Sequence, residues 1–445
     1  MRIQITFLLL SSALAAETSF VKDVQPILRK QCSACHQPAS KASNLDVTTW
    51  EALKLGGTQG AFFVPGDPGE SLAIKYVTGD KQPRMPMGLP ALSAADIDIL
   101  RDWIKTGAKD DSPRERITRT QTVYSQAPVI TALRFSPDGK TLAVSGNGEV
   151  LLHNADGSGI TKRLAGDAER LLSLAFSTDG KLLVVGGGTP ARFGEVQVWD
   201  LATSKQTQSM KLTSDTVFGA SLSPDSQRIA VGCTDNTVHV FETSSGKEAY
   251  KLNNHENWVL ATTFGINSKR FVSVGRDRAA KLIDASTGLF QENINLLRGE
   301  LTAIARHPQK DIVVIGGEDR IPYVYLLDRP KNMKIADDTT LVRKLERQNG
   351  IITALDWSGD AKWIAVAGAS PEVNVYDAST GELRVRLKGH TAGIYTVAFT
   401  PDGSRLATGG FDGKVRIYSI PDGQLVKEFI PVPLASNTLN AGAAQ

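Results

Sequence analysis

One short motif in this 445-residue chain combines residue types that carry chemistry at a fixed spacing. Cys32 and Cys35 are separated by two residues and followed directly by His36, a pattern that predicts a c-type haem attachment site. The two thiols would add to the haem vinyl groups, and the imidazole would be held against the iron as an axial ligand. A redox pair or a zinc pair is the alternative. Zinc would need two further ligands, and the only other cysteine is Cys233.

Two methionines later in the sequence offer a sixth ligand for such an iron. Met85 and Met87 precede a segment with helical periodicity. A sulfur ligand opposite histidine raises the reduction potential and leaves no open coordination position, which favours electron transfer over small-molecule chemistry. Met85 is the preferred ligand, because Pro86 fixes the chain direction after it, whereas Met87 leads into Gly88. A methionine that fills a gap in the core is the alternative interpretation.

Helical segments on both sides of these ligands are expected to position them. The apolar residues from Phe20 to Leu28 recur at helical spacing, so a short helix is predicted to run into the haem motif, and Pro26 places its regular part late. After the methionines, Ser93 and Asp96 form a helix-start signal. One apolar face comes next, at Ile97, Leu100, Trp103 and Ile104, and Gly107 is expected to end the helix.

The stretch between the haem motif and about residue 81 has few periodic runs and many glycines and prolines. Gly56-Gly57 and the segment 64–69, with two prolines and two glycines, are examples. Such stretches wrap ligands more often than they build sheets. We therefore predict loops here.

Residues 20–108 resemble the small c-type cytochrome domain named after planctomycetes. The resemblance implies one covalently attached haem c at Cys32 and Cys35, with His36 and Met85 as axial ligands. It covers about a fifth of the chain and implies no particular redox partner. The residues that match are Asp23 to Leu28, the motif at 32–36, Asn44-Leu45-Asp46, 64–68 with Ser71, Arg84-Met85-Pro86, and Leu100 to Ala108.

The first residues are typical of an export signal. A charged start is followed by an apolar run at 3–10 with one polar break, and Ala13-Leu14-Ala15 offers a cleavage site. The apolar run is shorter than the roughly 20 residues that span a membrane, and no later segment qualifies. We expect a signal peptide over 1–15, cleaved near Ala15, no membrane span after cleavage, and a periplasmic or otherwise exported protein. Export agrees with the resemblance, since c-type cytochromes receive haem outside the bacterial cytoplasm.

The composition of the chain argues against nucleic-acid binding and against a fold held by disulfides. The chain carries 50 Lys and Arg against 47 Asp and Glu, a formal net charge of +3, which gives no electrostatic footprint for nucleic acid. A single cysteine outside the motif excludes a disulfide-built fold. Cys233 is expected to be a small buried strand residue.

A second region begins after a polar segment at 109–126, which is predicted to be a linker, and its residues 117–124 alternate like a strand that could close the second region. From residue 129 the chain repeats a pattern of apolar strands and turns. Equivalent third-strand positions recur at 42-residue intervals in four of six cases, and at 46 and 51 in the others, which matches propeller blades. These seven positions are Val150, Val196, Val238, Ala280, Pro322, Val373 and Val415.

The repeats resemble those of a WD-repeat β-propeller over roughly residues 117–433. Trp199-Asp200 is a Trp-Asp strand ending, and the corresponding endings of other units are degenerate. The resemblance implies paired turn residues, namely His255 with Asp277 and His390 with Asp412, each 22 residues apart, with hydrogen bonds completed by Ser273 and Thr408.

The propeller sequence carries no obvious chemistry of its own. His153, His239 and His307 are expected to be structural, since none has a second ligand type at metal spacing. Two insertions, 189–194 and 329–342, break the repeat period. Inserted loops of this kind either form binding sites or are neutral elaborations of the fold. The second one contains Arg329, Lys331 and Lys334.

The expected architecture is a signal peptide (1–15), a small all-α cytochrome c domain (16–108), a linker with a possible closing strand (109–126), an all-β seven-bladed WD-repeat propeller (127–433) and a tail (434–445).

The expected function is single-electron transfer by one haem c, with a redox partner protein docked on the propeller, rather than a stand-alone enzyme. Nucleic acid is not an expected partner. The alternative is a haem-dependent periplasmic oxidoreductase whose propeller forms a catalytic or second-cofactor site, as in the haem d-type nitrite reductases. Those propellers have eight blades. A sensory protein whose haem reports redox state is a third interpretation.

Overall fold

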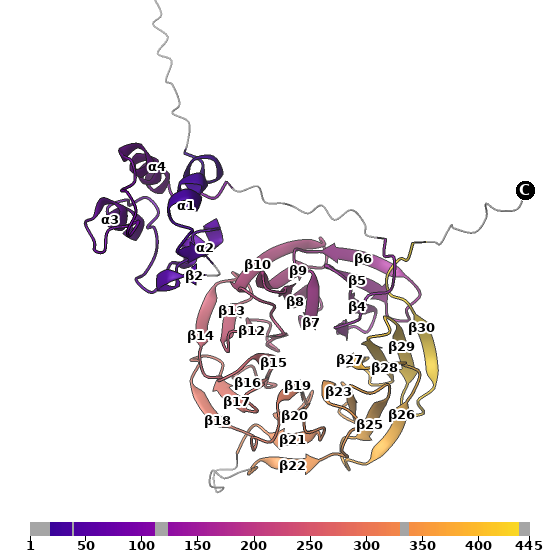
Figure 1. Ribbon diagram of the computed structural model, residues 1–445. Helices are drawn as coiled ribbons and strands as arrows, with labels where there is room; N and C mark the ends of the chain where they lie inside the picture. The colour runs from indigo at the N-terminus through magenta and orange to yellow at the C-terminus, as the bar shows by residue number, and fades with distance from the viewer. Residues whose placement is uncertain (1–17, 38–39, 112–122, 330–337, 436–445) are drawn as a thin grey trace, which may run out of the picture. The chain divides into compact units, whose positions relative to one another are not determined.

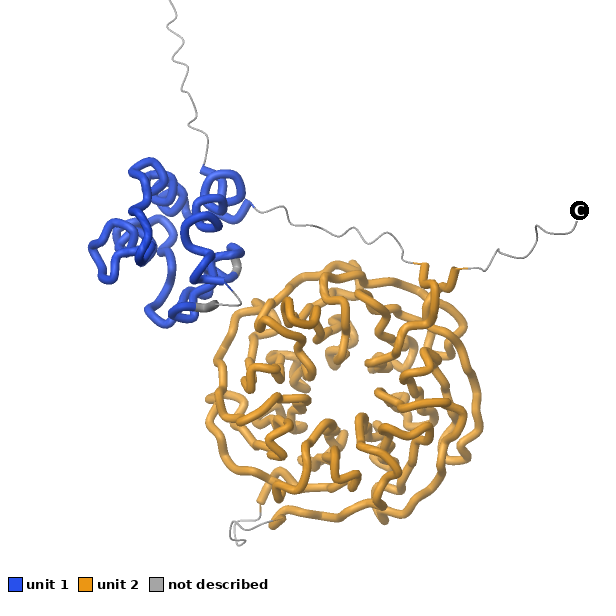
Figure 2. The backbone as a smooth tube through the Cα atoms, in the orientation of Figure 1, with its two compact units in different colours: residues 1–118 blue, residues 119–445 orange. Residues whose placement is uncertain are grey.

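The computed structural model describes residues 18–37, 40–111, 123–329 and 338–435. The chain divides into two compact units, residues 1–118 and residues 119–445 (Figure 2). The predicted signal peptide, residues 112–122 of the predicted linker, Lys331 and Lys334 lie outside the described residues. No helix within the described ranges is long and apolar enough to cross a membrane.

The first unit is helical apart from one short strand pair, β1 (His36–Gln37) with β2 (Ser40–Lys41). Phe20, Leu53, Trp103 and Ile104 lie in its core, all fully buried. The predicted all-α character of this unit is therefore confirmed. Its helical segments are η1 (Phe20–Val24), α1 (Gln25–Gln31), η2 (Ala42–Asn44), α2 (Trp50–Leu55), α3 (Leu72–Thr78) and α4 (Ala94–Lys105).

The helices on either side of the ligands agree with the sequence patterns. Pro26 occupies the first turn of α1, where its missing N–H is harmless. Ser93 caps α4, because its hydroxyl accepts the Asp96 N–H at 3.1 Å. The expectation that the intervening stretch is loop was wrong for α2 and α3. Thr49 caps α2 by accepting the Ala52 N–H at 3.1 Å, and both helices bury apolar residues in the core of the unit.

The second unit contains seven four-stranded antiparallel sheets in a ring (Figure 1). The first strand of each sheet contacts the first strand of the next sheet along the chain, and β27 of the last sheet contacts β3 of the first, so the ring is closed. This confirms the predicted seven-bladed propeller, with one sheet for each repeat of the sequence.

The strand bounds follow the repeat. The first three blades are β3 (Leu133–Phe135), β4 (Thr141–Ser145), β5 (Glu149–Asn154) and β6 (Ile160–Ala165); β7 (Arg170–Phe176), β8 (Leu182–Thr189), β9 (Phe193–Asp200) and β10 (Lys205–Thr213); and β11 (Gly219–Leu222), β12 (Arg228–Gly232), β13 (Val238–Glu242) and β14 (Glu248–Leu252). The fourth and fifth are β15 (Val259–Phe264), β16 (Arg270–Gly275), β17 (Ala280–Asp284) and β18 (Phe290–Asn293); and β19 (Leu301–Arg306), β20 (Ile312–Gly317), β21 (Tyr323–Leu326) and β22 (Leu341–Lys344). The last two are β23 (Ile352–Trp357), β24 (Trp363–Gly368), β25 (Val373–Asp377) and β26 (Leu383–Leu387); and β27 (Ile394–Phe399), β28 (Arg405–Gly410), β29 (Val415–Ser419) and β30 (Leu425–Phe429).

Apolar side chains hold the ring together at the junctions between blades. A buried apolar cluster joins each pair of neighbouring blades, including the last and the first. Val184 and Phe241, for example, belong to the cluster between the second and third blades. Because neighbouring blades cover the inner strands on both faces, second strands such as β4 and β12 are nearly continuously apolar and stand out in the sequence, whereas outer strands such as β6 and β30 are largely exposed.

Candidate haem site

The two motif cysteines lie in tight turns that continue the last turn of α1. The N–H groups of Cys32 and Ser33 both donate to Leu28 O, at 2.9 and 3.0 Å, and the His36 N–H donates to Cys32 O at 3.1 Å. Cys32 packs against the core of the unit, and this burial raises the pKa of its thiol to about 11. Cys35 is exposed, and both thiols are free. The turn therefore presents two unpaired thiols next to an imidazole.

A hydrogen bond fixes the ring of His36. Its Nδ1 lies 3.0 Å from Ala42 O, and a carbonyl oxygen can only accept, so Nδ1 carries the proton. Nε2 then keeps its lone pair, as a metal ligand requires. The backbone is fixed as well, because His36 pairs with Lys41 across β1 and β2 and its carbonyl accepts the Val47 N–H at 3.0 Å.

The two methionines differ in their surroundings. Met85 is half-buried, and its N–H donates to Tyr76 O of α3 at 3.0 Å. Met87 is 70% exposed. A half-buried methionine with an anchored backbone loses less conformational freedom on binding a metal than an exposed one. These observations support Met85, although the choice between the two sulfurs stays a prediction.

An aromatic group stabilises the scaffold that carries these donors. The Trp103 ring lies 5.5 Å from that of Phe20 and 5.1 Å from that of Phe63, measured between centroids. The indole N–H groups of Trp50 and Trp103 donate to Ala108 O and Lys109 O at 2.8 and 2.9 Å. These contacts tie η1, α2 and α4 to the end of the unit. Two free thiols, an imidazole with a free Nε2 and a half-buried thioether in one small unit form a donor set that fits haem c.

The histidines expected to stabilise blades have that role in the propeller. His255 Nδ1 lies 2.8 Å from Asp277 Oδ2, and its Nε2 lies 2.7 Å from Ser273 Oγ. His390 repeats the arrangement with Asp412 at 3.1 Å and Thr408 Oγ1 at 2.7 Å. Both paired turns implied by the WD-repeat resemblance are thus confirmed.

Of the three histidines expected to be structural, two are accounted for by hydrogen bonds. His153 Nε2 lies 3.0 Å from Pro431 O, and His307 Nδ1 accepts the N–H groups of Gln309 and Lys310 at 2.9 and 3.0 Å. For His239 the reason given for a structural role was wrong, because the fold brings two further ligand types close to it, the thiol of Cys233 and the carboxylate of Asp235. Cys233 is buried as expected, but it lies just beyond β12 rather than in it.

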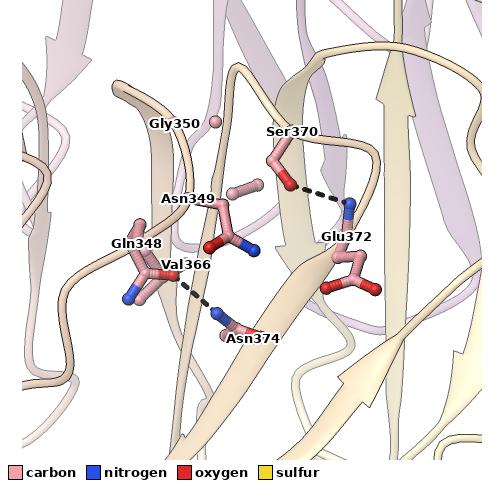
Figure 3. A pocket seen from close by; sticks show the side chains of 9 residues that line it. Gln348, Asn349, Gly350, Val366, Ser370, Glu372 and Asn374 are labelled. Carbon is pink, nitrogen blue, oxygen red and sulfur yellow. Dashed lines mark hydrogen bonds between the residues drawn. The ribbon is translucent and has the colours of Figure 1, made fainter.

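A small cavity lies beside the third strand of the sixth blade (Figure 3). Its volume is about 10 Å³, enough for one water molecule. Gln348 Oε1 accepts the Asn374 amide at 2.7 Å, and Asn374 Oδ1 has no partner within the described residues. A space of this size cannot hold a haem or another organic cofactor.

Comparison with protein families agrees with both units. Residues 32–87 match the model described as Planctomycete cytochrome C. Residues 117–154, 204–242, 339–377 and 381–419 match the WD domain, G-beta repeat. The chain is a planctomycete-type cytochrome c domain followed by a WD-repeat propeller. Both resemblances inferred from the sequence are therefore confirmed.

Curated relatives include an uncharacterized WD repeat-containing protein of Schizosaccharomyces pombe, which is 25% identical over 46% of this chain and 41% of its own length. Transcription factor unc-37 of Caenorhabditis elegans is 30% identical over 47% of this chain and 34% of its own length. The guanine nucleotide-binding protein subunit beta of Arabidopsis thaliana is 23% identical over 54% of each chain. The chain thus spans about half of these relatives or less.

A cytochrome c-type domain implies haem and electron transfer, and a WD propeller is usually a protein-interaction platform. The sequence did not reveal the carbonyl that orients His36, nor the group around His239. Asp235 and His239 are four residues apart, and their proximity to Cys233 depends on the turn between β12 and β13. The closeness of one thiol, one carboxylate and one imidazole in the sequence is a signal that could have identified the group.

Proposed function

We propose that this protein is an exported mono-haem c-type cytochrome that carries single electrons, and that its propeller docks a redox partner protein. The observation that supports the proposal most is the 3.0 Å contact between His36 Nδ1 and Ala42 O, which leaves Nε2 available as an iron ligand. An exported location follows from the signal-like residues 1–15.

Each residue of the site has a separate task. Haem, when bound, supplies a one-electron redox couple. Cys32 and Cys35 would tether it, His36 would provide a nitrogen ligand, and Met85 would provide a sulfur ligand. If these side chains supply both ligands, no coordination position would remain for a substrate, and the haem would supply electron transfer without bond formation to a partner. This arrangement disfavours the oxidoreductase alternative.

An aromatic and cationic group on the propeller is suited to docking. The rings of Phe218 and Trp258 stack at 5.8 Å between centroids, and the Arg276 guanidinium lies 4.1 Å from the centroid of Trp258. The Arg276 side chain is also 3.7 Å from Glu300. Trp, Tyr and Arg dominate the binding energy of protein interfaces. We assign the partner contact to this group, which we call the Trp258 group.

Visible spectroscopy of the matured full-length protein tests the haem site. We expect one six-coordinate haem c whose spectrum does not respond to carbon monoxide. Met85→Leu is expected to create carbon monoxide binding and lower the reduction potential, whereas the matched control Met87→Leu leaves both unchanged. The mass of the mature chain reports cleavage near Ala15 and one haem.

A second haem type, or carbon monoxide binding by the unaltered protein, would contradict the proposal and favour the oxidoreductase alternative. The reverse response of the two variants would assign the ligand to Met87.

Reduction kinetics test the docking surface. Trp258→Ala is expected to slow haem reduction by the soluble exported fraction of the source cells by roughly tenfold, the effect of losing about 1.4 kcal/mol at an interface hot spot. Reduction by ascorbate, which needs no docking, is expected to stay unchanged. Leu289→Ala serves as a control, since Leu289 is 66% exposed and lies outside the Trp258 group. Equal rates in all three proteins would exclude the group as the docking site.

A further inference from the structure

The third blade carries three different metal-binding side chains in one place. Cys233 follows β12, Asp235 lies in the turn between β12 and β13, and His239 lies on β13. The thiol sulfur, a carboxylate oxygen and a ring nitrogen all lie within 4.8 Å of one another. Cys233 is fully buried and His239 is 4% exposed, while Asp235 opens to solvent.

The imidazole of His239 is buried without hydrogen bonds. Neither ring nitrogen has a hydrogen-bond partner within the described residues. The nearest charged oxygen, Glu248 Oε2, lies 3.5 Å from Nδ1, too far for a good hydrogen bond. A buried polar group that has lost its water without gaining a partner is costly, and native proteins rarely keep one without a reason. A ligand that accepts the nitrogen lone pair would remove this cost.

The other blades show what normally occupies the position of His239. Four polar residues there have hydrogen-bond partners: Gln197 with Glu195, Tyr323 with Asp319, Asn374 with Gln348, and Arg416 with Asp412. Four blades thus provide a hydrogen bond at this position, and His239, whose contact with Glu248 is 3.5 Å long, lacks one.

The other two side chains of the group also depart from the repeat. Asp235 is equivalent to Asp277 and Asp412, but Thr213 stands where those blades have the histidine partner. The third blade therefore lacks the histidine–aspartate bond. At the position of Cys233, four blades have glycine, namely Gly275, Gly317, Gly368 and Gly410. The third blade, which lacks the histidine–aspartate pair of the fourth and seventh blades, carries a thiol and an imidazole beside its carboxylate.

We propose that Cys233, Asp235 and His239 bind one divalent transition-metal ion of the zinc class. Thiolate, imidazole and carboxylate are the ligands that zinc takes in tetrahedral sites. Ligand atoms in such a site lie roughly 3.5 Å apart, so small movements of the exposed Asp235 turn complete the geometry. The fourth position is left to water or to Glu248, whose side chain is 42% exposed. The ion takes the place of the missing histidine–aspartate pair in stabilising this blade.

The ammonium group of Lys251 competes with the metal ion for the carboxylate of Asp235. Lys251 Nζ lies 3.6 Å from Asp235 Oδ2, and its side chain is 41% exposed, so it can move into solvent when the ion enters. Lys251→Gln is accordingly expected to tighten metal binding.

Zinc binding to the full-length, matured protein tests the site. The protein is stripped with a chelator and titrated with Zn²⁺, and bound zinc is measured by elemental analysis. We expect one equivalent and a higher midpoint of thermal unfolding, since an ion bound to the folded state stabilises it. X-ray absorption at the zinc edge is expected to show one sulfur at about 2.3 Å and nitrogen and oxygen at about 2.0–2.2 Å.

The control variants come from the chain's own repeats. Cys233→Gly and His239→Gln introduce the residues of other blades, so the fold is retained, and each is expected to weaken zinc binding by roughly a hundredfold or more. His153→Gln removes a buried strand histidine outside the group and is expected to bind zinc normally. The proposal is wrong if the unaltered protein takes up no zinc, if its zinc shell contains no sulfur, or if both variants bind as it does. The absorption measurement needs no variant, so a folding defect cannot obscure the result.

Discussion

The histidines of this chain differ in what their ring nitrogens contact. His36 donates to a carbonyl oxygen with one nitrogen and has no partner for the other within the described residues, whereas His255 has a carboxylate and a hydroxyl on its two nitrogens. His153 contacts the carbonyl of Pro431, and His239 has no hydrogen-bond partner within the described segments. Histidine serves as ligand, hydrogen-bond bridge or strand residue according to these partners. The residue type alone does not separate the roles.

His153 makes the stability of the propeller depend on pH. Burial lowers the pKa of its imidazole, and the contact with Pro431 O offsets this only in part. The unfolded chain takes up a proton near pH 6.5, whereas the folded state resists it, so the unfolded state binds more protons as pH falls. The contribution of neutral His153 to the free energy of unfolding is therefore fully present above about pH 6.5, and it is lost as the pH falls below that value. His153→Gln is expected to show a shallower loss of thermal stability between about pH 7.5 and pH 5, measured by calorimetry. Identical pH slopes for the two proteins would refute this assignment.

At the scale of elements, hydrogen bonds connect strands of different blades as well as strands within one. The Asp356 carboxylate of β23 is 7% exposed as a residue, and it links three blades. One oxygen lies 2.7 Å from Arg134 Nη1 of β3, and the other accepts the Phe399 N–H of β27 at 2.8 Å. This single side chain therefore ties the sixth, seventh and first blades together, across the point where the ring closes.

Replacing that carboxylate is expected to destabilise the ring strongly. Asp356→Ala leaves the buried Phe399 N–H without its acceptor, at an expected cost of about 2–3 kcal/mol, and the loss of the counter-charge adds little because the Arg134 side chain is 43% exposed. Denaturant titration of the full-length variant measures this loss as a change in the free energy of unfolding. Asp422→Ala, on an exposed turn, is the control, with an expected change within about 0.5 kcal/mol. Similar values for the two variants would mean that Asp356 does not join the blades energetically.

On the scale of the whole molecule, the start and the end of the described propeller segment meet outside the sheets. Within the described residues, the sheet of the seventh blade consists of β27 to β30 and contains no strand from the start of the propeller. Instead the Tyr124 N–H donates to Pro433 O at 2.9 Å, and Tyr124 pairs with Leu434 in a parallel bridge. The Tyr124 ring is buried with Leu151 and Val432, and its hydroxyl donates to Glu149 at 2.7 Å. Residues 117–122 of the expected closing strand lie outside the described segments.

Tyr124 is thus expected to stabilise the closed ring strongly, although it lies outside the seven sheets. Tyr124→Ala is expected to lower the free energy of unfolding by about 3–5 kcal/mol, as for other buried aromatic residues. Tyr395→Ala is the matched control, since Tyr395 is 40% exposed, and a loss of about 1 kcal/mol or less is expected there. Calorimetry of both full-length variants checks the difference. Equal losses would show that the contact between Tyr124 and the end of the propeller does not stabilise the ring.

The sequence by itself determined the features that are local or repeated. Two cysteines and one histidine within five positions defined the haem motif, the helical spacing around Trp103 predicted α4, and a period of about 42 residues predicted the blades. Each of these patterns lies within a few turns of chain or recurs, so it can be recognised without knowing the fold.

Only the tertiary structure decided the rest. α2 and α3 are six and seven residues long, too short to be stable alone, and they depend on burying Leu53 and Ile74 against other segments of the unit. The orientation of His36 depends on the carbonyl of Ala42, and the metal group of the third blade depends on how the turn after β12 brings Cys233 to His239. Such contacts join residues whose side chains have no common periodicity, so their chemistry emerges only when folding has brought the atoms together.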